Sequence, residues 1–371
     1  MLPLLSACGG GGDGSSGVTP PPAGSSELVV QVTGVGNVKS QLAGIDCSTG
    51  NCTALFATNT LVVLTATPAS GQLFQGWGGA CAGSASICSV TLSQTLSVTA
   101  RFAAITGNAG VSYESAVFTA SRADLQRQMN AQGAKGFNYF GPQVLSGAFF
   151  NFYAKDSNTT YTAEILDNAT SGSALLGQLN AQGAKGFDFW GPDTVGAVYT
   201  RESNASAVSF EVLASPTTVA GFLSQANAQG DKGFLYVGPY TFGNIYRKSS
   251  ASNAKYVYRL ELQSPTHDAL LVQANAQGQQ GYKFNGLEVF SGEPVGGFRN
   301  IYVKDTSQSS TFTWKNNPAA TSAASLVSQA NTEGAAGYLY WFSVILGGAQ
   351  REIYFKPGNC VGTLCRSTNP L

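Results

Sequence analysis

The chain has 371 residues, of which 43% are apolar and only 11% are charged, and its 20 basic and 20 acidic residues give a formal net charge of zero. This composition predicts two or three folded domains and excludes a disordered chain. It also excludes a nucleic-acid partner, because phosphate binding needs clustered lysine and arginine and no run of either sign occurs. No internal apolar stretch approaches the length that spans a bilayer.

The first eight residues, MLPLLSAC, precede a stretch rich in glycine, serine and proline. Residues 5–8 resemble a bacterial lipobox, in which a signal peptidase cuts before the cysteine, here Cys8, and the thiol receives a diacylglycerol. The resemblance implies a signal remnant at 1–8, a flexible tether at 9–27 and a membrane partner reached through the lipid. Because Gly9 and not aspartate follows the cysteine, it implies a Gram-negative outer-membrane lipoprotein, on either face. The alternative is a disordered N-terminus that happens to contain a cysteine.

The other six cysteines fall into three close pairs. They are Cys47 and Cys52, Cys81 and Cys88, and Cys360 and Cys365. Six thiols allow about 15 pairings, and proximity within one hairpin or loop favours these three disulfides. A zinc site is disfavoured, because the chain has no CxxC spacing and a single histidine. We therefore expect an oxidising compartment and neither a metal ion nor a cofactor.

Residues 28–104 alternate between apolar and polar side chains in short runs separated by glycine, asparagine and serine, which predicts β-strands. The expected strands are LVVQVTG, TALFA, LVVLTATP, LFQGWGG, CSVTL and LSVTARF. A G-x-G turn at Gly34 and Gly36, paired cysteines, LTATP at 64–68, F-x-GW-GAC at 74–81 and VTA-x-F at 98–102 resemble the divergent internalin B-type (InlB) repeat. The resemblance implies a small, disulfide-pinned β domain of cell-surface proteins, a spacer or adhesion-associated module without catalysis. Trp77 is expected in its core, beside Cys81.

From Val111 onward one phrase recurs five times, as in NAQGAKGF ending at Phe137, at spacings of 50, 47, 48 and 56 residues. Each copy leaves room for one helix and about three strands but not for a core of its own. We predict five βαββ repeats at approximately 110–156, 157–203, 204–250, 251–305 and 306–357, and a tail at 358–371. The motif N-x-x-G-x-x-G before an aromatic resembles the bacterial domain of unknown function DUF4177, which implies a compact βαββ unit with no assigned activity. The predicted fold class is therefore α+β.

The sequence leaves open how the five repeats are arranged. They form either an open array or a closed five-bladed α/β ring of the kind seen in pentein-fold proteins. In a ring, Tyr113–Thr119 would complete the last unit beside Arg351–Lys356.

Local signals place the helix and strands within each repeat. Ser121 is expected to cap a first helix that runs to about Gln132, with Gly133 in a left-handed C-cap. Apolar side chains four residues apart define the helix face that packs on the sheet: Leu125/Met129, Leu175/Leu179, Phe222/Ala226, Leu270/Ala274 and Leu326/Ala330. Aromatic pairs supply the strand side of the core: Phe137/Tyr139, Phe187/Phe189, Phe234/Tyr236, Tyr282/Phe284 and Tyr338/Tyr340.

The repeated Gln-x-Asn is the best candidate for a role beyond packing. It occurs at Gln128 and Asn130, Gln178 and Asn180, Gln225 and Asn227, Gln273 and Asn275, and Gln329 and Asn331. Five amides in equivalent places could line a ring, but asparagine near a helix end commonly binds backbone groups, so we interpret them as structural. The glycine-proline pairs at Pro142, Pro192 and Pro239 predict turns.

An enzyme is not predicted, because the chain offers no nucleophile with a base and no metal cluster. No cysteine lies between Cys88 and Cys360, and His267 at a helix start is expected to be solvent-exposed. The acidic residues Asp188, Glu211, Glu261 and Glu288 are scattered and are not expected in equivalent repeat positions.

Two functions remain. The first is a non-enzymatic protein-binding, adhesion or envelope-structural module with an unknown protein partner. The alternative is carbohydrate binding, since low charge with 40 aromatic residues suits stacking on sugars. Aromatics exposed on one face would favour a glycan, with Trp190, Trp314 and Trp341 as candidates, and a continuous apolar patch would favour a protein.

Overall fold

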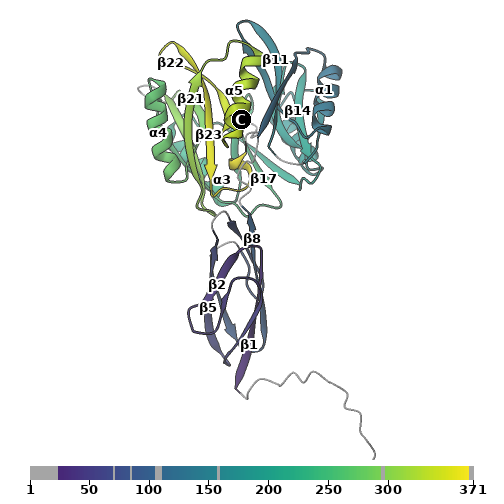
Figure 1. Cartoon of the computed structure of the whole chain (residues 1–371). Helices are drawn as coiled ribbons and strands as arrows, with labels where there is room; N and C mark the ends of the chain where they lie inside the picture. Colours follow the sequence, from purple (N-terminus) through teal and green to yellow (C-terminus); the bar gives the residue numbers. More distant parts are fainter. Residues whose placement is uncertain are drawn as a thin grey trace, which may run out of the picture. The chain divides into compact units, whose positions relative to one another are not determined.

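The computed structural model describes residues 24–69, 72–83, 86–104, 111–156, 159–293 and 297–366, and the chain divides into two compact units, the first of which ends at Phe102. Figure 1 shows strands in the first unit and both strands and helices in the second. The lipobox and Cys8 lie outside the described residues. Within the described residues, no helix is long and apolar enough to cross a membrane.

The first unit is a sandwich whose described residues form two four-stranded sheets, ordered β4-β1-β8-β6 and β3-β2-β5-β7. The strands are β1 (Ser25–Thr33), β2 (Gly36–Ser40), β3 (Asp46–Cys47), β4 (Gly50–Ala57), β5 (Thr60–Pro68), β6 (Gln72–Gly79), β7 (Ile87–Leu92) and β8 (Leu96–Ala104). Alternate residues of both sheets, such as Leu28, Val30 and Val62, are fully buried in one shared core. This is the packing that the alternating sequence predicts.

Both predicted disulfides of the first unit are confirmed, and each joins one sheet to the other. Cys47 in β3 bonds to Cys52 in β4. Cys81, just after β6, bonds to Cys88 in β7. Each bond closes a loop of only a few residues, so each stabilises the fold by no more than about 3 kcal/mol.

Two details of the first unit differ from expectation. β1 begins at Ser25, so the predicted tether, which ended at residue 27, is too long by three residues. The short strands β2 and β3 were not predicted, because β2 has Val38 as its one large apolar residue and β3 has only two residues. Trp77 is 8% exposed and lies in the core with Cys81, as expected.

The second unit repeats one strand, one helix and two strands five times within the described residues, and Figure 1 shows α1 and α4 on opposite sides with strands between them. The first three repeats contain β9 (Ser112–Val117), α1 (Arg122–Ala134), β10 (Asn138–Leu145), β11 (Ala148–Lys155), β12 (Tyr161–Leu166), α2 (Gly172–Gly183), β13 (Asp188–Asp193), β14 (Gly196–Glu202), β15 (Val208–Leu213), α3 (Val219–Asp231), β16 (Leu235–Tyr240) and β17 (Gly243–Ser249). The last two contain β18 (Tyr256–Leu262), α4 (His267–Gln279), β19 (Lys283–Val289), β20 (Phe298–Asp305), β21 (Thr311–Pro318), α5 (Ala323–Ala335), β22 (Leu339–Leu346) and β23 (Ala349–Gly358). Each repeat forms its own antiparallel sheet, with the third strand between the second and the first.

The strand β9 completes the first sheet and not the last. Tyr113 of β9 pairs with Ala154 of β11. The segment Arg351–Lys356 of β23 pairs instead with β21, which already supplies the first strand of the fifth repeat. The expected pairing of Tyr113–Thr119 with Arg351–Lys356 is therefore wrong.

The first helix begins as predicted. The Ser121 hydroxyl accepts a hydrogen bond from the Asp124 N–H, and a serine or threonine caps each of the other four helices in the same way. The predicted apolar face is also confirmed, because both members of every pair four residues apart, such as Leu125 and Met129, are buried.

The end of the first helix was predicted two residues too early, and its left-handed glycine three residues too early. α1 continues through Gly133, and it is Gly136 that takes the left-handed conformation, with a φ of 91°. The Phe137 N–H donates to the Gln132 carbonyl at 3.0 Å, the long bond of a Schellman motif that the other four helices share. The motif turns the chain directly from the helix into the second strand.

Each helix packs against the first strand of the following repeat as well as the second strand of its own, and α5 packs in the same way against β9. Glycine makes this approach possible. A Cβ on Gly183 of α2 would lie 2.1 Å from the Val208 carbonyl oxygen at the start of β15, so only glycine fits. Gly334 of α5 has the same relation to Val111, again at 2.1 Å. The core of the second unit therefore lies between consecutive repeats.

Candidate functional site

Every sheet of the second unit carries a β-bulge at the same place in its second strand. In β10 the register shifts between Tyr139 and Gly141, which leaves Phe140 as the extra residue. The same shift sets apart the equivalent residues Trp190, Val237, Asn285 and Trp341. A bulge redirects one side chain, and bulges are frequent beside binding sites. The prolines that predicted turns, Pro142, Pro192 and Pro239, lie within these bulged strands instead.

The five bulge residues all line one cavity of about 850 Å³, which we call the bulge cavity. Its wall comes mainly from the second strands of all five repeats. The aromatic wall residues are Phe140, Trp190, Tyr236, Tyr240, Trp341 and Phe342, and the wall residues with polar side chains that are not aromatic are Gln143, Thr241, Asn285 and Glu288. The volume lies in the range of about 300–1,000 Å³ that is typical of pockets for small organic ligands.

Contacts between the second strands of neighbouring repeats along the chain, and one contact between the last and the first repeat, fix the positions of wall residues. The pairs are Tyr139 with Trp190, Phe189 with Tyr240, Tyr236 with Glu288, Phe284 with Phe342, and Tyr340 with Phe140. Four are ring contacts with centroids 5.0 to 5.9 Å apart, and the Tyr236 hydroxyl donates to Glu288 Oε2 at 2.7 Å. The side chains of the wall are thus held in place before any ligand arrives.

The repeated glutamine binds within its own repeat. Gln178 Oε1 accepts from the Tyr199 hydroxyl, and its Nε2 donates to the Asp167 carbonyl, both at 2.9 Å. The other four glutamines make the same two contacts, with the hydroxyls of Tyr153, Tyr246, Tyr302 and Tyr354 and with a carbonyl at the end of the first strand. All five tyrosines are fully buried, so each glutamine satisfies a hydroxyl that water does not reach.

The repeated asparagine binds the next repeat. Asn180 Oδ1 accepts from the Phe210 N–H at 2.8 Å, and Nδ2 donates to the Phe210 carbonyl at 3.2 Å. Asn130, Asn227 and Asn275 accept in the same way from Ala163, Tyr258 and Trp314. Asn331 of α5 accepts from the Tyr113 N–H at 2.7 Å and donates to its carbonyl at 3.1 Å. Each of these asparagines takes the place of a missing neighbour strand at the edge of a sheet. None of the ten residues of the Gln-x-Asn repeats is among the wall residues of the bulge cavity.

Glu288 carries the one charge among the described residues of the bulge cavity. Burial raises the pKa of its carboxyl, and hydrogen bonds from Tyr236 and from the Val289 backbone oppose that rise in part. Burial, together with the nearby Glu288 carboxylate, also raises the pKa of the Tyr236 hydroxyl. This hydroxyl therefore stays protonated and donates a hydrogen bond to Glu288. Arg299, the cross-strand neighbour of Glu288, has its guanidinium 3.8 Å from Glu293 and is not a wall residue.

Lys283, the first residue of β19, is fully buried and packs on Trp341 of the wall. Its Nζ lies 4.0 Å from the centre of the Trp341 ring and 4.2 Å from that of Phe355. Among the described residues nothing forms a hydrogen bond with Nζ, and burial lowers the pKa of this amine well below its usual value. Asn285 Oδ1, Trp341 Nε1 and the Tyr240 hydroxyl of the wall also lack a hydrogen-bond partner among the described residues.

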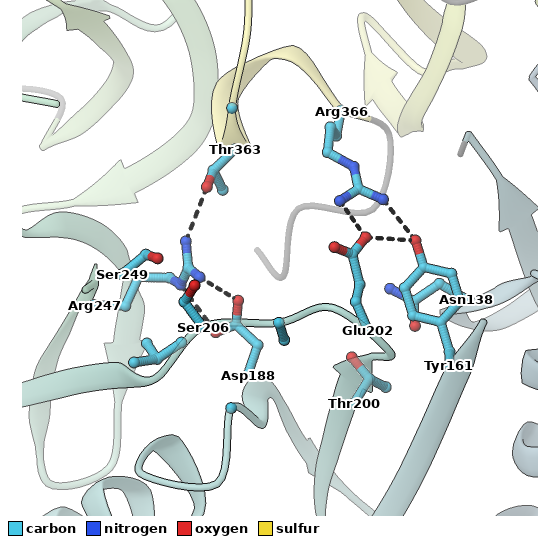
Figure 2. Close-up of a pocket in the computed structure, with 14 residues that line it drawn as sticks. Asn138, Tyr161, Asp188, Thr200, Glu202, Ser206, Arg247, Ser249, Thr363 and Arg366 are labelled. Carbon is cyan, nitrogen blue, oxygen red and sulfur yellow. Dashed lines mark hydrogen bonds and ion pairs between the residues drawn. The ribbon is translucent and has the colours of Figure 1, made fainter. Parts of the chain in front are cut away.

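A second, smaller cavity of about 220 Å³ lies where the tail meets the repeats (Figure 2). Arg366 of the tail donates to Asp156 at 2.7 Å and to the Tyr161 hydroxyl at 2.6 Å, and it pairs with Glu202. The Asp156 side chain is fully buried, so this ion pair satisfies a charge that has no contact with solvent.

The opposite wall of this smaller cavity is held by a second arginine. Arg247 pairs with Asp188 at 2.5 Å and donates to Thr363 Oγ1 of the tail at 3.0 Å (Figure 2). The tail itself is fixed by the disulfide between Cys360 and Cys365. Because the arginines and carboxylates here pair with each other, we interpret this cavity as the anchorage of the tail.

The structure separates the candidate tryptophans. Trp190 is half-buried and Trp341 is 7% exposed, and both line the bulge cavity. Trp314 lies in the core instead, 3% exposed, and offers no surface to a ligand. The expectation that His267 is exposed is wrong, since its side chain is buried. Its Nε2 lies 3.1 Å from the Val344 carbonyl oxygen in the next repeat.

The acidic residues are more regular than expected. Glu211 holds the same place as Glu164 of the preceding repeat, and each accepts from a glutamine of its own helix, Gln229 at 2.7 Å and Gln182 at 2.8 Å. These contacts are structural. In the part of the chain that the structure describes, no group of three or more histidine, cysteine, aspartate or glutamate side chains could hold a metal ion.

Sequence reasoning missed three of the bulge residues. They are Phe140, Val237 and Asn285. The available signal was their place in the repeat, since each stands directly before the glycine that follows the strand aromatics. The bulge itself is a property of strand register, which a single sequence does not reveal.

Residues 43–106 match the family model of the divergent InlB B-repeat domain, which confirms the resemblance predicted for the first unit. The match suggests a cell-surface protein. No curated protein and no solved structure gives a significant match to the chain.

Proposed function

We propose that the protein is a non-enzymatic binding protein of the cell envelope, whose repeat unit holds a small, largely apolar ligand in the bulge cavity. One observation carries this proposal: each of the five repeats directs one bulge residue to the same cavity. These residues differ, being phenylalanine, tryptophan, valine, asparagine and tryptophan, whereas the asparagines and glycines that join the repeats are identical. The identical residues join the repeats and form what we call the frame. The bulge residues differ at equivalent positions, which suits a wall that fits one asymmetric ligand.

We further propose that the five βαββ units, which resemble DUF4177, close into a ring around the bulge cavity. Contacts between the last and first repeats support closure, because they repeat contacts made between neighbours along the chain. Asn331 binds the Tyr113 backbone as the other asparagines bind theirs. The Tyr113 hydroxyl accepts from the Tyr340 N–H at 2.7 Å, as the Tyr258 hydroxyl accepts from the Tyr236 N–H at 2.7 Å.

The lipobox resemblance supports a diacylglycerol on Cys8 and attachment to the outer membrane, and the InlB-like domain supports a spacer between membrane and repeats. Metabolic labelling with an alkyne fatty acid tests the anchor. We expect labelled wild-type protein and unlabelled Cys8→Ala, and equal labelling of the two would contradict it.

The binding function is tested with the purified full chain and a broad panel of small molecules, glycans included, read by the melting temperature and tryptophan fluorescence. We expect a stabilising ligand whose effect disappears in Thr241→Trp, which places a large ring at an exposed position of the cavity wall. Thr194→Trp is the matched control, since Thr194 holds the equivalent place in the preceding hairpin, is exposed and does not line the cavity. A ligand that binds both variants equally well would contradict the proposal.

A protein partner is the second candidate, because large apolar side chains are exposed near the hairpins that join second and third strands. Phe149 is 58% exposed and Ile345 is 69% exposed, and Val144 and Val289 are exposed as well. Crosslinking on cells distinguishes the two functions. A captured partner that is lost in the double variant Phe149→Ser/Ile345→Ser but kept in Thr241→Trp would assign binding to the hairpins.

A further inference from the structure

We infer that the bulge cavity binds an organic cation, an alkylammonium or quaternary ammonium group, surrounded by the aromatic wall and balanced by Glu288. This inference rests on the proposed function, since it names the chemical class of the ligand held in that cavity. It is carried by the composition of the wall, its single charge and the few hydrogen-bonding groups that the wall offers.

The aromatic side chains supply the first part of the argument. Six of them line the cavity, and the face of an aromatic ring attracts a cation whose centre lies within about 6 Å. Trp190 is supported by Tyr139 behind it at 5.0 Å, and Tyr240 by Phe189 at 5.4 Å. The rings are therefore fixed before binding, and a cation does not have to order them.

The charge of the wall points to the sign of the ligand. Glu288 is the one carboxylic acid among its described residues, and no lysine, arginine or histidine is among them. The carboxylate is partly buried and is held by the Tyr236 hydroxyl at 2.7 Å. A carboxylate in a partly water-excluded wall attracts a cation and repels an anion more strongly than it would in bulk water.

Lys283 does not cancel this charge. Its amine lies 4.0 Å from the centre of the Trp341 ring and packs against that ring. Lys283 itself is not among the wall residues of the cavity. The amine is fully buried and has no hydrogen-bond partner among the described residues, and such burial favours its neutral form. Among the described residues that line the cavity, Glu288 is therefore the one with a charged side chain.

A sugar fits this wall less well than a cation does. Each sugar hydroxyl needs a hydrogen-bond partner, and a buried hydroxyl without one weakens binding. Besides Glu288 and the tyrosines, the wall offers only Gln143, Thr241 and Asn285 as polar side chains in contact with the cavity, together with the indole N–H groups of its tryptophans. A quaternary ammonium group has no hydrogen-bond donor and needs only ring faces and a counter-charge.

The experiment compares choline with 3,3-dimethyl-1-butanol, its uncharged carbon isostere, by calorimetry and tryptophan fluorescence of the full chain. We expect choline to bind at least about tenfold more tightly than the isostere, because only choline gains from ring faces and carboxylate. Glu288→Gln should remove most of this preference. Glu114→Gln, which makes the same charge change at a partly exposed position outside the wall, should leave it intact. Phosphatidylcholine vesicles, with phosphatidylglycerol vesicles as control, and a trimethyllysine peptide then distinguish a lipid headgroup from a protein side chain as the source.

The outcomes separate this inference from the function on which it rests. If the isostere or a sugar binds as tightly as choline, and Thr241→Trp abolishes that binding, the cation inference is overturned while the bulge cavity remains a binding site. If no ammonium compound binds, the inference is likewise overturned, and the broad panel decides the proposed function. Choline binding that Glu288→Gln leaves unchanged would also overturn it, because the carboxylate is required as counter-charge.

Discussion

Replacement of Asn331 by alanine is the sharpest test of how the last repeat meets the first. The variant removes two hydrogen bonds to the backbone of Tyr113, of 2.7 and 3.1 Å, and leaves an N–H and a carbonyl of a residue that is 1% exposed without these partners. Unpaired buried groups of this kind cost about 1–3 kcal/mol. For a unit of this size we expect the melting temperature to fall by about 2–4 °C for each kcal/mol lost.

Urea unfolding followed by tryptophan fluorescence gives the change in the free energy of unfolding. Asn180→Ala, which removes the equivalent contact with Phe210, should be destabilised equally, to within about 0.5 kcal/mol. Asn253→Ala, at an exposed loop position, should change stability by no more than about 0.5 kcal/mol. Hydrogen exchange should also show faster exchange of the Tyr113 amide in Asn331→Ala. If Asn331→Ala behaves like Asn253→Ala, the last and first repeats are not joined in solution and the ring proposal fails.

Three further changes test the frame. Gly183→Ala should lower the free energy of unfolding by about 1–3 kcal/mol, because the new Cβ would lie 2.1 Å from a carbonyl oxygen of the next repeat. Gly177→Ala in the same helix meets open space and should raise the free energy of unfolding by about 0.5–1 kcal/mol. Equal effects of the two variants in urea unfolding would contradict this packing. Arg366→Ala should cost about 3 kcal/mol in thermal melts, since it leaves the buried carboxylate of Asp156 unpaired, and a neutral result would show that the tail is not anchored there. Burial raises the pKa of the Glu333 carboxyl, but hydrogen bonds from a lysine and an asparagine lower this pKa by more, so the pKa in the folded protein is below its usual value. The charged carboxylate therefore stabilises the folded protein above the unfolded pKa of about 4.3, and this contribution is lost as pH falls through the folded pKa. The stability difference between wild type and Glu333→Gln should therefore shrink between pH 7 and pH 3, and a constant difference would refute this assignment.

The frame of the molecule was largely predictable from the sequence, because it depends on local periodicity. Alternation gave the strands that contain Leu28 and Val62, and the spacing of Leu125 and Met129 gave the buried helix face. Cysteine proximity gave the disulfides, such as that between Cys47 and Cys52. Each of these signals lies within about ten residues of chain, where the geometry of one strand, helix or loop fixes which side chains face the same way.

The candidate site was much less predictable, because it depends on register and on contacts between distant residues. Trp190, Trp341 and Trp314 were candidates together, and nothing in the local sequence distinguished the first two, which line the cavity, from Trp314, which is in the core. The local sequence predicts that His267 is an exposed residue at a helix start. In the structure it contacts Val344 in the hairpin of the next repeat. Burial decided by a neighbouring repeat is not encoded in the local pattern.

The two parts of each repeat can vary independently, and this is why a repeat array is suited to binding. The junction uses an asparagine and a glycine on the helix, such as Asn180 and Gly183, whereas the wall uses the strand residue at the bulge, such as Trp190. A change at the bulge alters the cavity without touching a hydrogen bond between repeats. Valine at Val237 and asparagine at Asn285 occupy the same backbone geometry as tryptophan does in other repeats, with the bulge preserved. The same bulged backbone therefore carries different side chains in different repeats, while the asparagines and glycines that join the repeats stay identical.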